Sequence, residues 1–322
     1  MPNVISGPML VAGLRAEFAD TYRSTYDGLK AKLGRVMQLG LQSEKLTELY
    51  GFFRSAPFPK LWKRGDEIST KAFDSLGFSV TNFDWGRRVK WHKNDRMDDQ
   101  TKTLYDQAQQ CGRNWATLPE RIFFQILTGA VDAELLPAVP LAPDGVALFS
   151  AAARFGNAAG NVVAGSGVAT AAAIQTDFYS AMARFMSYQD TEGQPLLQPD
   201  VIDGKVILIC NANNIEVFQK AFLQRTVESS SLGSAPTNVI LDALFKVEIW
   251  PTQRLTDNDW FVFLEGAPKK AIFQQIRQPM EYHAMTMDTS DSAATTKEEY
   301  TQWDSREGYG LGLPFGAIQV NN

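Results

Sequence analysis

The chain contains 322 residues, of which 44% are hydrophobic and 21% are charged, a composition typical of a globular protein with a substantial core. Its formal net charge is −5, whereas a protein that reads a DNA sequence normally presents a concentrated basic face, so direct DNA recognition is disfavoured. No apolar run approaches the ~18–20 residues of a membrane span, and the first residues lack the features of a signal peptide, so we expect a cytoplasmic protein.

Residues 1–57 begin without a regular pattern and then show apolar residues at near-helical spacing, from Phe18 to Val36. Gly28 and Gly34 weaken this helix, because glycine loses more conformational freedom than other residues when a helix forms. We therefore predict an N-terminal arm with one short helix, and not an independent domain.

Residues 58–93 change to an alternating pattern that is typical of β-strands. The pattern predicts one strand at residues 78–80 and a second at residues 85–91, paired as a long hairpin. Aromatic side chains on so polar a ribbon have two explanations: either another molecule covers them, or they pack on the core of the same chain. The candidates for a subunit interface are Trp62, Phe73, Trp85, Arg87 and Arg88.

A long helix is predicted over residues 97–127, where apolar residues recur at steps of three and four. Aspartates at residues 98–99 favour a helix start, because negative charge stabilises the N-terminal end of a helix. Pro119 interrupts the pattern, and Thr117 with Glu120 forms a candidate capping box. The helix is therefore either kinked or restarted at this point.

Residues 129–173 are rich in alanine and glycine, which indicates loops. The pattern then predicts a helix at residues 174–185 and a strand followed by a helix within residues 201–225. Further strands are predicted at residues 245–250, 260–264 and 271–276. Residues 284–302 are polar. This mixed order, without a βαβ repeat, predicts an α+β fold.

Residues suited to chemistry are scarce. Only two histidines occur, His92 and His283, and neither lies in a motif with metal-ligand spacing. Residues 165–167 are similar to part of a phosphate-binding loop, but Thr170 stands where a third glycine is needed and no strand is predicted before them. We predict no catalytic residue, no cofactor and no metal site, and we expect that the protein is not an enzyme.

Several short stretches occur in a fixed order from about residue 20 to the end of the chain, among them WGRRVKW at residues 85–91 and REGYG at residues 306–310. The others are at residues 78–80, 94–100, 148–150, 156–157, 199–200, 206–209, 237–239, 245–247, 255–257, 260–261 and 313–316. In this order they resemble the Mu-like phage major head subunit family, which has the Hong Kong phage capsid fold. Arg154 and Phe155 depart from the family's pattern.

The resemblance implies that the chain is the major capsid protein of a tailed phage or prophage. It implies assembly into hexamers and pentamers of an icosahedral head that encloses double-stranded DNA. It also implies five parts along the chain: an N-terminal arm at residues 1–57, an extended-loop hairpin at 58–93, a peripheral domain at 94–197 with a spine helix at about 97–127, an axial domain at 198–270, and a return to the peripheral domain with a C-terminal segment at 271–322.

The partners implied by the resemblance are further copies of this chain, a separate scaffold protein and a portal, with a cement or decoration protein as a further candidate. A separate scaffold is implied because the N-terminal arm is too short to contain a scaffolding domain. Contact with the packaged DNA would be non-specific, and no membrane is involved. The protein would assemble in the host bacterial cytoplasm and reside in the virion capsid.

Two alternatives stay open. The first is another shell with the same fold, an encapsulin-type nanocompartment. The second belongs to a different class, an enzyme that uses the glycine-rich segment at residues 145–170 as a ligand loop. For the capsid interpretation, we expect Trp85→Ala, or deletion of residues 64–75, to leave a folded subunit that fails to form closed shells.

Overall fold

The computed structural model describes residues 7–55, 59–65, 67–68, 70, 74–94, 103–190, 193–197, 205–223, 246–267, 269–286 and 291–322. The chain folds into two compact units. The first unit combines Met1–Glu48, Val80–Phe123 and Gln274–Tyr309, and the second combines Leu49–Ser79, Phe124–Phe273 and Gly310–Asn322. Within the described ranges, no helix has both the length and the apolar character needed to cross a bilayer.

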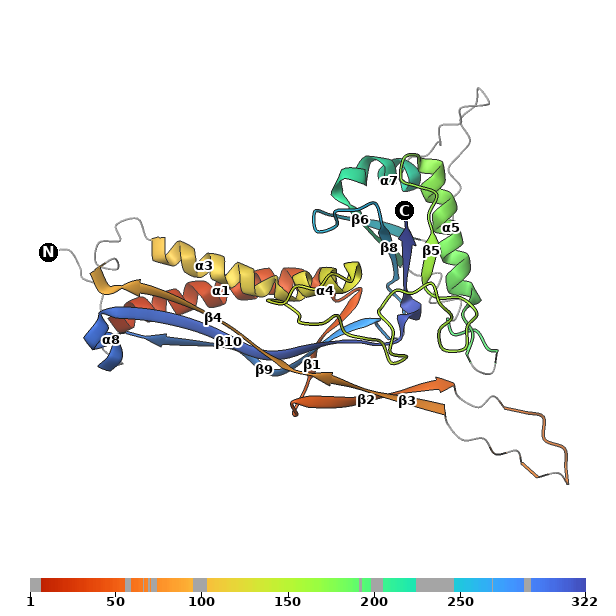
Figure 1. The fold of residues 1–322 in the computed structure, drawn as a ribbon, viewed down its shortest axis with the longest axis horizontal. Helices are drawn as coiled ribbons and strands as arrows, with labels where there is room; N and C mark the ends of the chain where they lie inside the picture. Colours follow the sequence, from red (N-terminus) through yellow and green to blue (C-terminus); the bar gives the residue numbers. More distant parts are fainter. Residues whose placement is uncertain are drawn as a thin grey trace. The chain divides into compact units, whose positions relative to one another are not determined.

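A four-stranded sheet forms the frame of the first unit, with its strands in the order β1, β9, β10, β4. The strands are β1 (Met37–Gln42), β9 (Ile272–Met285), β10 (Glu298–Leu311) and β4 (Phe83–His92). Two helices, α1 (Gly7–Leu33) and α3 (Thr103–Ala116), lie side by side along this sheet (Figure 1). A short helix, α8 (Asp291–Thr296), precedes β10.

The side of β10 that is turned inward is largely polar. Alternate residues of a strand point to opposite faces of its sheet. Up to residue 307, the buried residues of β10 are Glu299, Thr301, Trp303, Ser305 and Glu307, and residues 308–311 are all buried. Phe18 of α1 stacks on Trp303, with 4.8 Å between the ring centroids. Tyr282 of β9 lies against both rings, so an aromatic cluster interrupts the polar layer.

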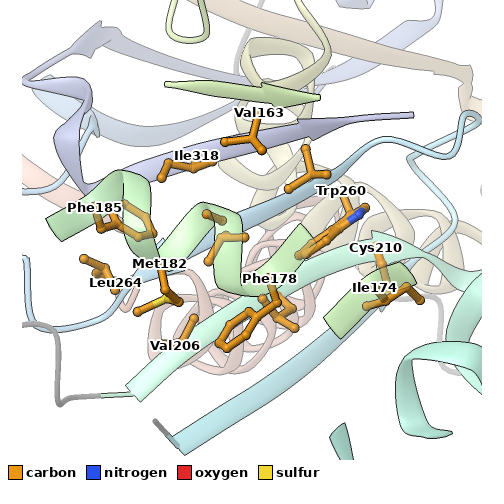
Figure 2. Close-up of a cluster of buried hydrophobic side chains, with 14 of the residues drawn as sticks. Val163, Ile174, Phe178, Met182, Phe185, Val206, Cys210, Trp260, Leu264 and Ile318 are labelled. Carbon is orange, nitrogen blue, oxygen red and sulfur yellow. The ribbon is translucent and has the colours of Figure 1, made fainter. Parts of the chain in front are cut away.

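A five-stranded sheet forms the centre of the second unit, in the order β5, β11, β8, β6, β7. The strands are β5 (Val162–Ala164), β11 (Ala317–Asn321), β8 (Trp260–Leu264), β6 (Lys205–Asn211) and β7 (Lys246–Thr252). Two helices, α5 (Ala171–Ser187) and α7 (Ile215–Phe222), share one hydrophobic core with the sheet (Figure 2). On the opposite face of the sheet, Phe149 packs on Phe261, with 5.1 Å between the centroids.

Helix α5 shows how the local sequence produces this core. The Thr170 side chain caps the helix by accepting a hydrogen bond from the amide of Ala173 at 3.2 Å. Phe178 and Phe185 are seven residues apart, so they lie on the same face of the helix, and both are fully buried. In Figure 2 they point into the layer that also contains Trp260 of β8.

The α+β class is confirmed, as are most elements of the second unit. The predicted strands within residues 206–209, 245–250 and 260–264 overlap β6, β7 and β8. The predicted helices overlap α5 and α7. From residue 103 on, the helix predicted at residues 97–127 is present as α3 and α4 (Leu118–Thr128), and of the two alternatives at Pro119, a kink or a restart, the structure has the restart. Residues 98–99 lie outside the described residues.

The prediction of one short helix in residues 1–57 is wrong, because α1 spans 27 residues. Gly28 lies inside the helix, and Gly34 follows its last residue. Gly112 of α3 allows α1 to approach closely, since a Cβ atom there would lie 2.8 Å from the carbonyl oxygen of Phe18. Tertiary packing of this kind stabilises a helix beyond what its own pattern indicates.

The predicted hairpin within residues 58–93 is also wrong in its pairing. Only Asn82 separates β3 (Asp74–Thr81) from β4, and one residue is too short for a hairpin turn. Instead β3 pairs with β2 (Thr47–Ser55), and β4 pairs antiparallel with β10. Residues 85–91 therefore belong to the four-stranded sheet of the first unit.

Candidate assembly surfaces

The strands β2 and β3 form a two-stranded ribbon, hereafter the ribbon, which with its connection spans residues 47–81. An isolated ribbon of two strands is marginally stable in water unless another surface covers it. Within the second unit, the ring of Tyr50 lies 5.5 Å from Phe78 and 5.0 Å from the buried ring of Phe273, measured between centroids. This aromatic cluster holds the ribbon at its base.

Asn82, directly after the ribbon, is fixed within the first unit by buried hydrogen bonds. Its Nδ2 donates to Ser43 Oγ at 2.7 Å and to the carbonyl oxygen of Lys45 at 2.8 Å. Its Oδ1 accepts from Gln275 Nε2 at 2.9 Å. A buried amide with three partners fixes the chain direction between β3 and β4.

The ribbon carries large apolar side chains with a high exposed fraction. Leu61 is 90% exposed and Trp62 is 55% exposed. Leu49 and Ile68 are also largely exposed. Several exposed apolar side chains in one short segment indicate an interaction surface. Leu49, Leu61 and Ile68 are not among the predicted interface residues, and no pattern in the sequence distinguishes them from core residues.

The predicted interface residues fall in different places. Trp62 lies on the exposed connection of the ribbon, while Phe73 lies outside the described residues. Trp85 lies on β4, where its Nε1 donates to the carbonyl oxygen of Glu307 at 3.1 Å and its ring meets Tyr309 edge-on at 6.3 Å. For Trp85, the structure therefore provides packing partners within the same unit.

Arg87 and Arg88 also lie on β4, and both are exposed. The guanidinium of Arg88 lies 4.3 Å from the ring centroid of Tyr300 and donates to Gln302 Oε1 at 2.8 Å. The neighbouring Lys90 forms an exposed ion pair with Glu298 at 3.1 Å. The basic side chains of this strand thus each lie next to an acidic or neutral side chain. They do not form the concentrated basic face that is typical of a nucleic-acid site.

The loop that contains Arg154 and Phe155 is held by a buried ion pair. The Arg154 guanidinium is almost fully buried and contacts the Asp144 carboxylate at 2.7 Å. It also donates to the carbonyl oxygen of Leu148 at 2.6 Å. Phe155 adopts a left-handed backbone conformation with φ of 51°, which is uncommon for a bulky residue. The departure from the family pattern is therefore a structured turn around a buried arginine.

Within the glycine-rich segment, the amides of residues 165–167 all have hydrogen-bond partners in the chain. The amide of Gly165 donates to the carbonyl oxygen of Asn321 at 2.8 Å, and that of Gly167 donates to Asn322 Oδ1 at 2.9 Å. The amide and hydroxyl of Ser166 both donate to the Asp177 carboxylate, at 2.8 and 2.7 Å. A phosphate-binding loop needs such amides to be available. This weakens the alternative of an enzyme with a ligand loop here.

The two histidines do not form a site with each other. His283 is exposed on β9, with its Nε2 at 3.6 Å from Glu281 and 3.5 Å from Asp304, and His92 ends β4. In the part of the chain that the structure describes, no group of three or more His, Cys, Asp or Glu residues could hold a metal ion.

The fold is similar to that of solved capsid structures. The capsid structure of the cyanophage P-SCSP1u has 13% identity and a TM-score of 0.55, covering 88% of this chain and 86% of that chain. A structure from Mycobacterium phage Adephagia has 13% identity and a TM-score of 0.54, covering 89% and 88%. A virus-like particle from Pyrococcus furiosus has 8% identity and a TM-score of 0.52, covering 97% and 99%. At these identities the likeness shows the fold alone, and no curated protein matches the sequence.

The family follows from the sequence match. The profile described as "Mu-like prophage major head subunit gpT" matches residues 11–179, just over half of the 322-residue chain. The encapsulin-type alternative has no better support, and a family of structural capsid proteins argues against an enzyme. The chain belongs to the Mu-like prophage major head subunit gpT family, and it is a major capsid protein of a tailed phage or prophage.

Proposed function

We propose that the chain assembles with itself into the hexamers and pentamers of an icosahedral head that encloses double-stranded DNA. Membership in a major head subunit family supports assembly into a capsid shell. The net charge of −5 supports a wall that contacts DNA only non-specifically, because an acidic surface does not adhere to a polyanion.

The observation that carries the proposal is the exposed apolar surface of the ribbon. We propose that the ribbon, and not the predicted residues 58–93, is the extended loop, and that it lies on a neighbouring subunit. Burying Leu61 and Trp62 there would remove their apolar surface from water at every interface. A closed symmetry repeats this contact many times, so modest contacts suffice for a stable shell.

The remaining organisation is also a proposal. The helices α3 and α4 would form the spine of the peripheral domain, to which residues 271–322 return. Residues 198–270 would belong to the axial domain together with α5, β5 and β11, because these elements share one core with β6 and β8. The partners would be a separate scaffold protein, a portal and a cement or decoration protein, with assembly in the host bacterial cytoplasm.

The direct test is a double variant, Leu61→Ser with Trp62→Ser, expressed with the head proteins of the same phage. Both side chains are exposed, so the subunit should keep the circular dichroism and melting temperature of the wild type. The yield of closed shells in negative-stain micrographs should fall at least tenfold. The matched control is Lys60→Ser, which changes an exposed residue of the same connection without removing apolar surface.

Two results would contradict the proposal. One is a normal yield of closed shells from the double variant. The other is an equal loss of shells from Lys60→Ser, because the effect would then come from any change in the connection. Wild-type shells without hexamers and pentamers in an image reconstruction would contradict the icosahedral assignment itself.

A further inference from the structure

Helix α5 of the second unit has an outward side without charge. Its inward side, with Phe178 and Phe185, belongs to the core (Figure 2). The structure describes every residue of α5, and none of its seven exposed residues is charged. About a quarter to a third of a soluble protein surface usually is. The outer face of α5, as we call this set, consists of Ala172, Thr176, Tyr179, Ser180, Ala183, Met186 and Ser187.

The two charged residues of α5 have partners within the subunit. Asp177 is buried and accepts hydrogen bonds from the amide and the hydroxyl of Ser166. Arg184 donates to a backbone carbonyl of the preceding loop at 2.9 Å. The neighbouring helix α7 differs, because its exposed side carries an ion pair between Glu216 and Lys220 at 2.8 Å. The lack of charge therefore distinguishes α5 from the helix beside it.

The hydroxyl groups of the outer face donate to the helix itself. The hydroxyl of Thr176 donates to the carbonyl oxygen of Ala172 at 3.0 Å, and that of Ser180 donates to the carbonyl oxygen of Thr176 at 3.0 Å. The Ser187 hydroxyl donates to the carbonyl oxygen of Arg184 at 2.8 Å. Covering a polar group costs little when its hydrogen bond is kept. Another molecule can therefore cover this face without breaking these hydrogen bonds.

Two large side chains provide most of the apolar surface of the outer face. Tyr179 is 44% exposed and Met186 is 54% exposed. They are seven residues apart and lie on one side of the helix, with Ala183 between them. Tyrosine and methionine are enriched in protein–protein interfaces, while lysine, glutamate and aspartate are depleted. In its large side chains and its lack of charge, the outer face resembles the centre of an interface.

A second exposed apolar surface lies on the opposite face of the same sheet. The loop that packs there through Phe149 contains a turn at residues 141–146, hereafter the 141–146 turn. In this turn, Leu141 is 56% exposed and Val146 is 37% exposed. The second unit thus presents exposed apolar side chains on both sides of its central sheet.

The 141–146 turn is fixed by hydrogen bonds, and its charge is paired. The amide of Ala142 donates to the carbonyl oxygen of Val146 at 2.8 Å. Asp144 is the only charged residue of the turn, and its carboxylate pairs with the buried guanidinium of Arg154 at 2.7 Å. A surface that is ordered before binding loses less conformational entropy when it binds.

We propose that the outer face of α5 packs on the 141–146 turn of a neighbouring copy of this chain, and that this contact repeats around each hexamer and pentamer. The inference rests on the proposed function, and the contact is separate from that of the ribbon. The partner is a second copy because membership in a major head subunit family supports a shell built from copies of this chain.

The positions of the two surfaces suit a ring. Each subunit of a ring needs two different contact surfaces, and surfaces on opposite sides of one sheet can form such a head-to-tail contact. Neither the outer face of α5 nor the 141–146 turn brings an unpaired charge into the contact. Burying them together therefore avoids the large cost of removing an unpaired ion from water.

The test is a charge at the centre of the outer face. Ala183→Glu, expressed with the head proteins of the same phage, should keep the circular dichroism of the wild type, because residue 183 is exposed. The yield of closed shells should fall about tenfold or more, because the contact would bury an unpaired carboxylate. The control Gln219→Glu adds the same charge to the exposed side of α7 and should keep the yield. Adding Val146→Lys to Ala183→Glu should restore most of the yield, because it supplies an opposite charge.

A normal yield from Ala183→Glu, an equal loss from Gln219→Glu, or no recovery with Val146→Lys would overturn the inference. If Ala183→Glu does not fold, an image reconstruction of the wild-type shell decides, and it should show the outer face of α5 against the 141–146 turn of the next subunit. Hexamers and pentamers in which this face lies in solvent would overturn the inference and leave the proposed function intact. A shell without hexamers and pentamers would overturn both.

Discussion

The interiors of the two units differ in kind. The second unit contains a continuous apolar core, in which burial raises the pKa of the Cys210 thiol to about 12. The first unit buries Glu307 beside a cavity. In the described residues, six buried side-chain polar atoms have no hydrogen-bond partner in the protein, and four of them lie in the first unit: Gln274 Oε1, Tyr282 Oη, Trp303 Nε1 and Ser305 Oγ. Apolar packing is insensitive to pH, whereas buried polar groups are not. One subunit thus combines a unit with a continuous apolar core and a unit whose interior is partly polar.

The largest effect is expected in the apolar core. Phe178→Ala should destabilise the second unit by about 3–5 kcal/mol, because it removes a fully buried ring and leaves a cavity. Hydrogen exchange should accelerate in α5 and α7 and stay unchanged in α1. Equal acceleration in α1 would show that the two units do not have separate stabilities.

Arg154→Ala should destabilise the second unit by about 2–4 kcal/mol, because it removes the charged partner of the Asp144 carboxylate and one of the two donors to the Leu148 carbonyl, which keeps the hydrogen bond from Asn161. Urea unfolding measures the loss. Arg154→Lys is the control, and it should recover only part of the stability, since an ammonium does not reproduce the paired contacts of a guanidinium. Full recovery would mean that charge alone fixes this loop.

Trp85→Ala should cost about 2 kcal/mol in the first unit, because it removes the contact with Tyr309 and a hydrogen bond to the backbone. Trp85→Phe keeps a ring and should cost about 1 kcal/mol. Urea unfolding distinguishes the two variants. If Trp85→Ala keeps the stability of the wild type but does not form shells, Trp85 acts at a subunit interface, as the sequence predicted, and not in packing within the first unit.

Ser305→Ala should have the smallest effect, a gain of up to about 1 kcal/mol, because it removes a buried hydroxyl without a protein partner. Thermal unfolding of the subunit measures this gain. A clear loss of stability would show that the Ser305 hydroxyl forms a hydrogen bond to water in the cavity. The interior of the first unit would then be hydrated at this position.

The apolar core was predictable because its pattern is simple. Residues 206–209 and 260–264 are apolar runs, and a run of this kind predicts a buried strand. β10 was not predictable in the same way. Its inward positions include Glu299, Ser305 and Glu307, so the alternation of buried and exposed residues does not coincide with an alternation of apolar and polar ones.

The candidate surface was predictable only in part. Exposed aromatic residues on a polar ribbon predicted that Trp62 faces a partner, which stays a prediction until a shell is examined. The pairing of β3 with β2 depends on contacts distant in sequence, so alternation at residues 78–91 could not distinguish a hairpin from two successive strands. Because the alternation was interpreted as a hairpin, Trp85 was predicted to lie on the ribbon. In the structure it packs on Tyr309.

An image reconstruction of a shell assembled from the wild-type chain tests the central claim most directly. The claim predicts density for residues 47–81 that extends over a neighbouring subunit, with the side chains of Leu61 and Trp62 buried in that contact. Density that leaves both side chains in solvent, or that returns the ribbon to its own subunit, would contradict it.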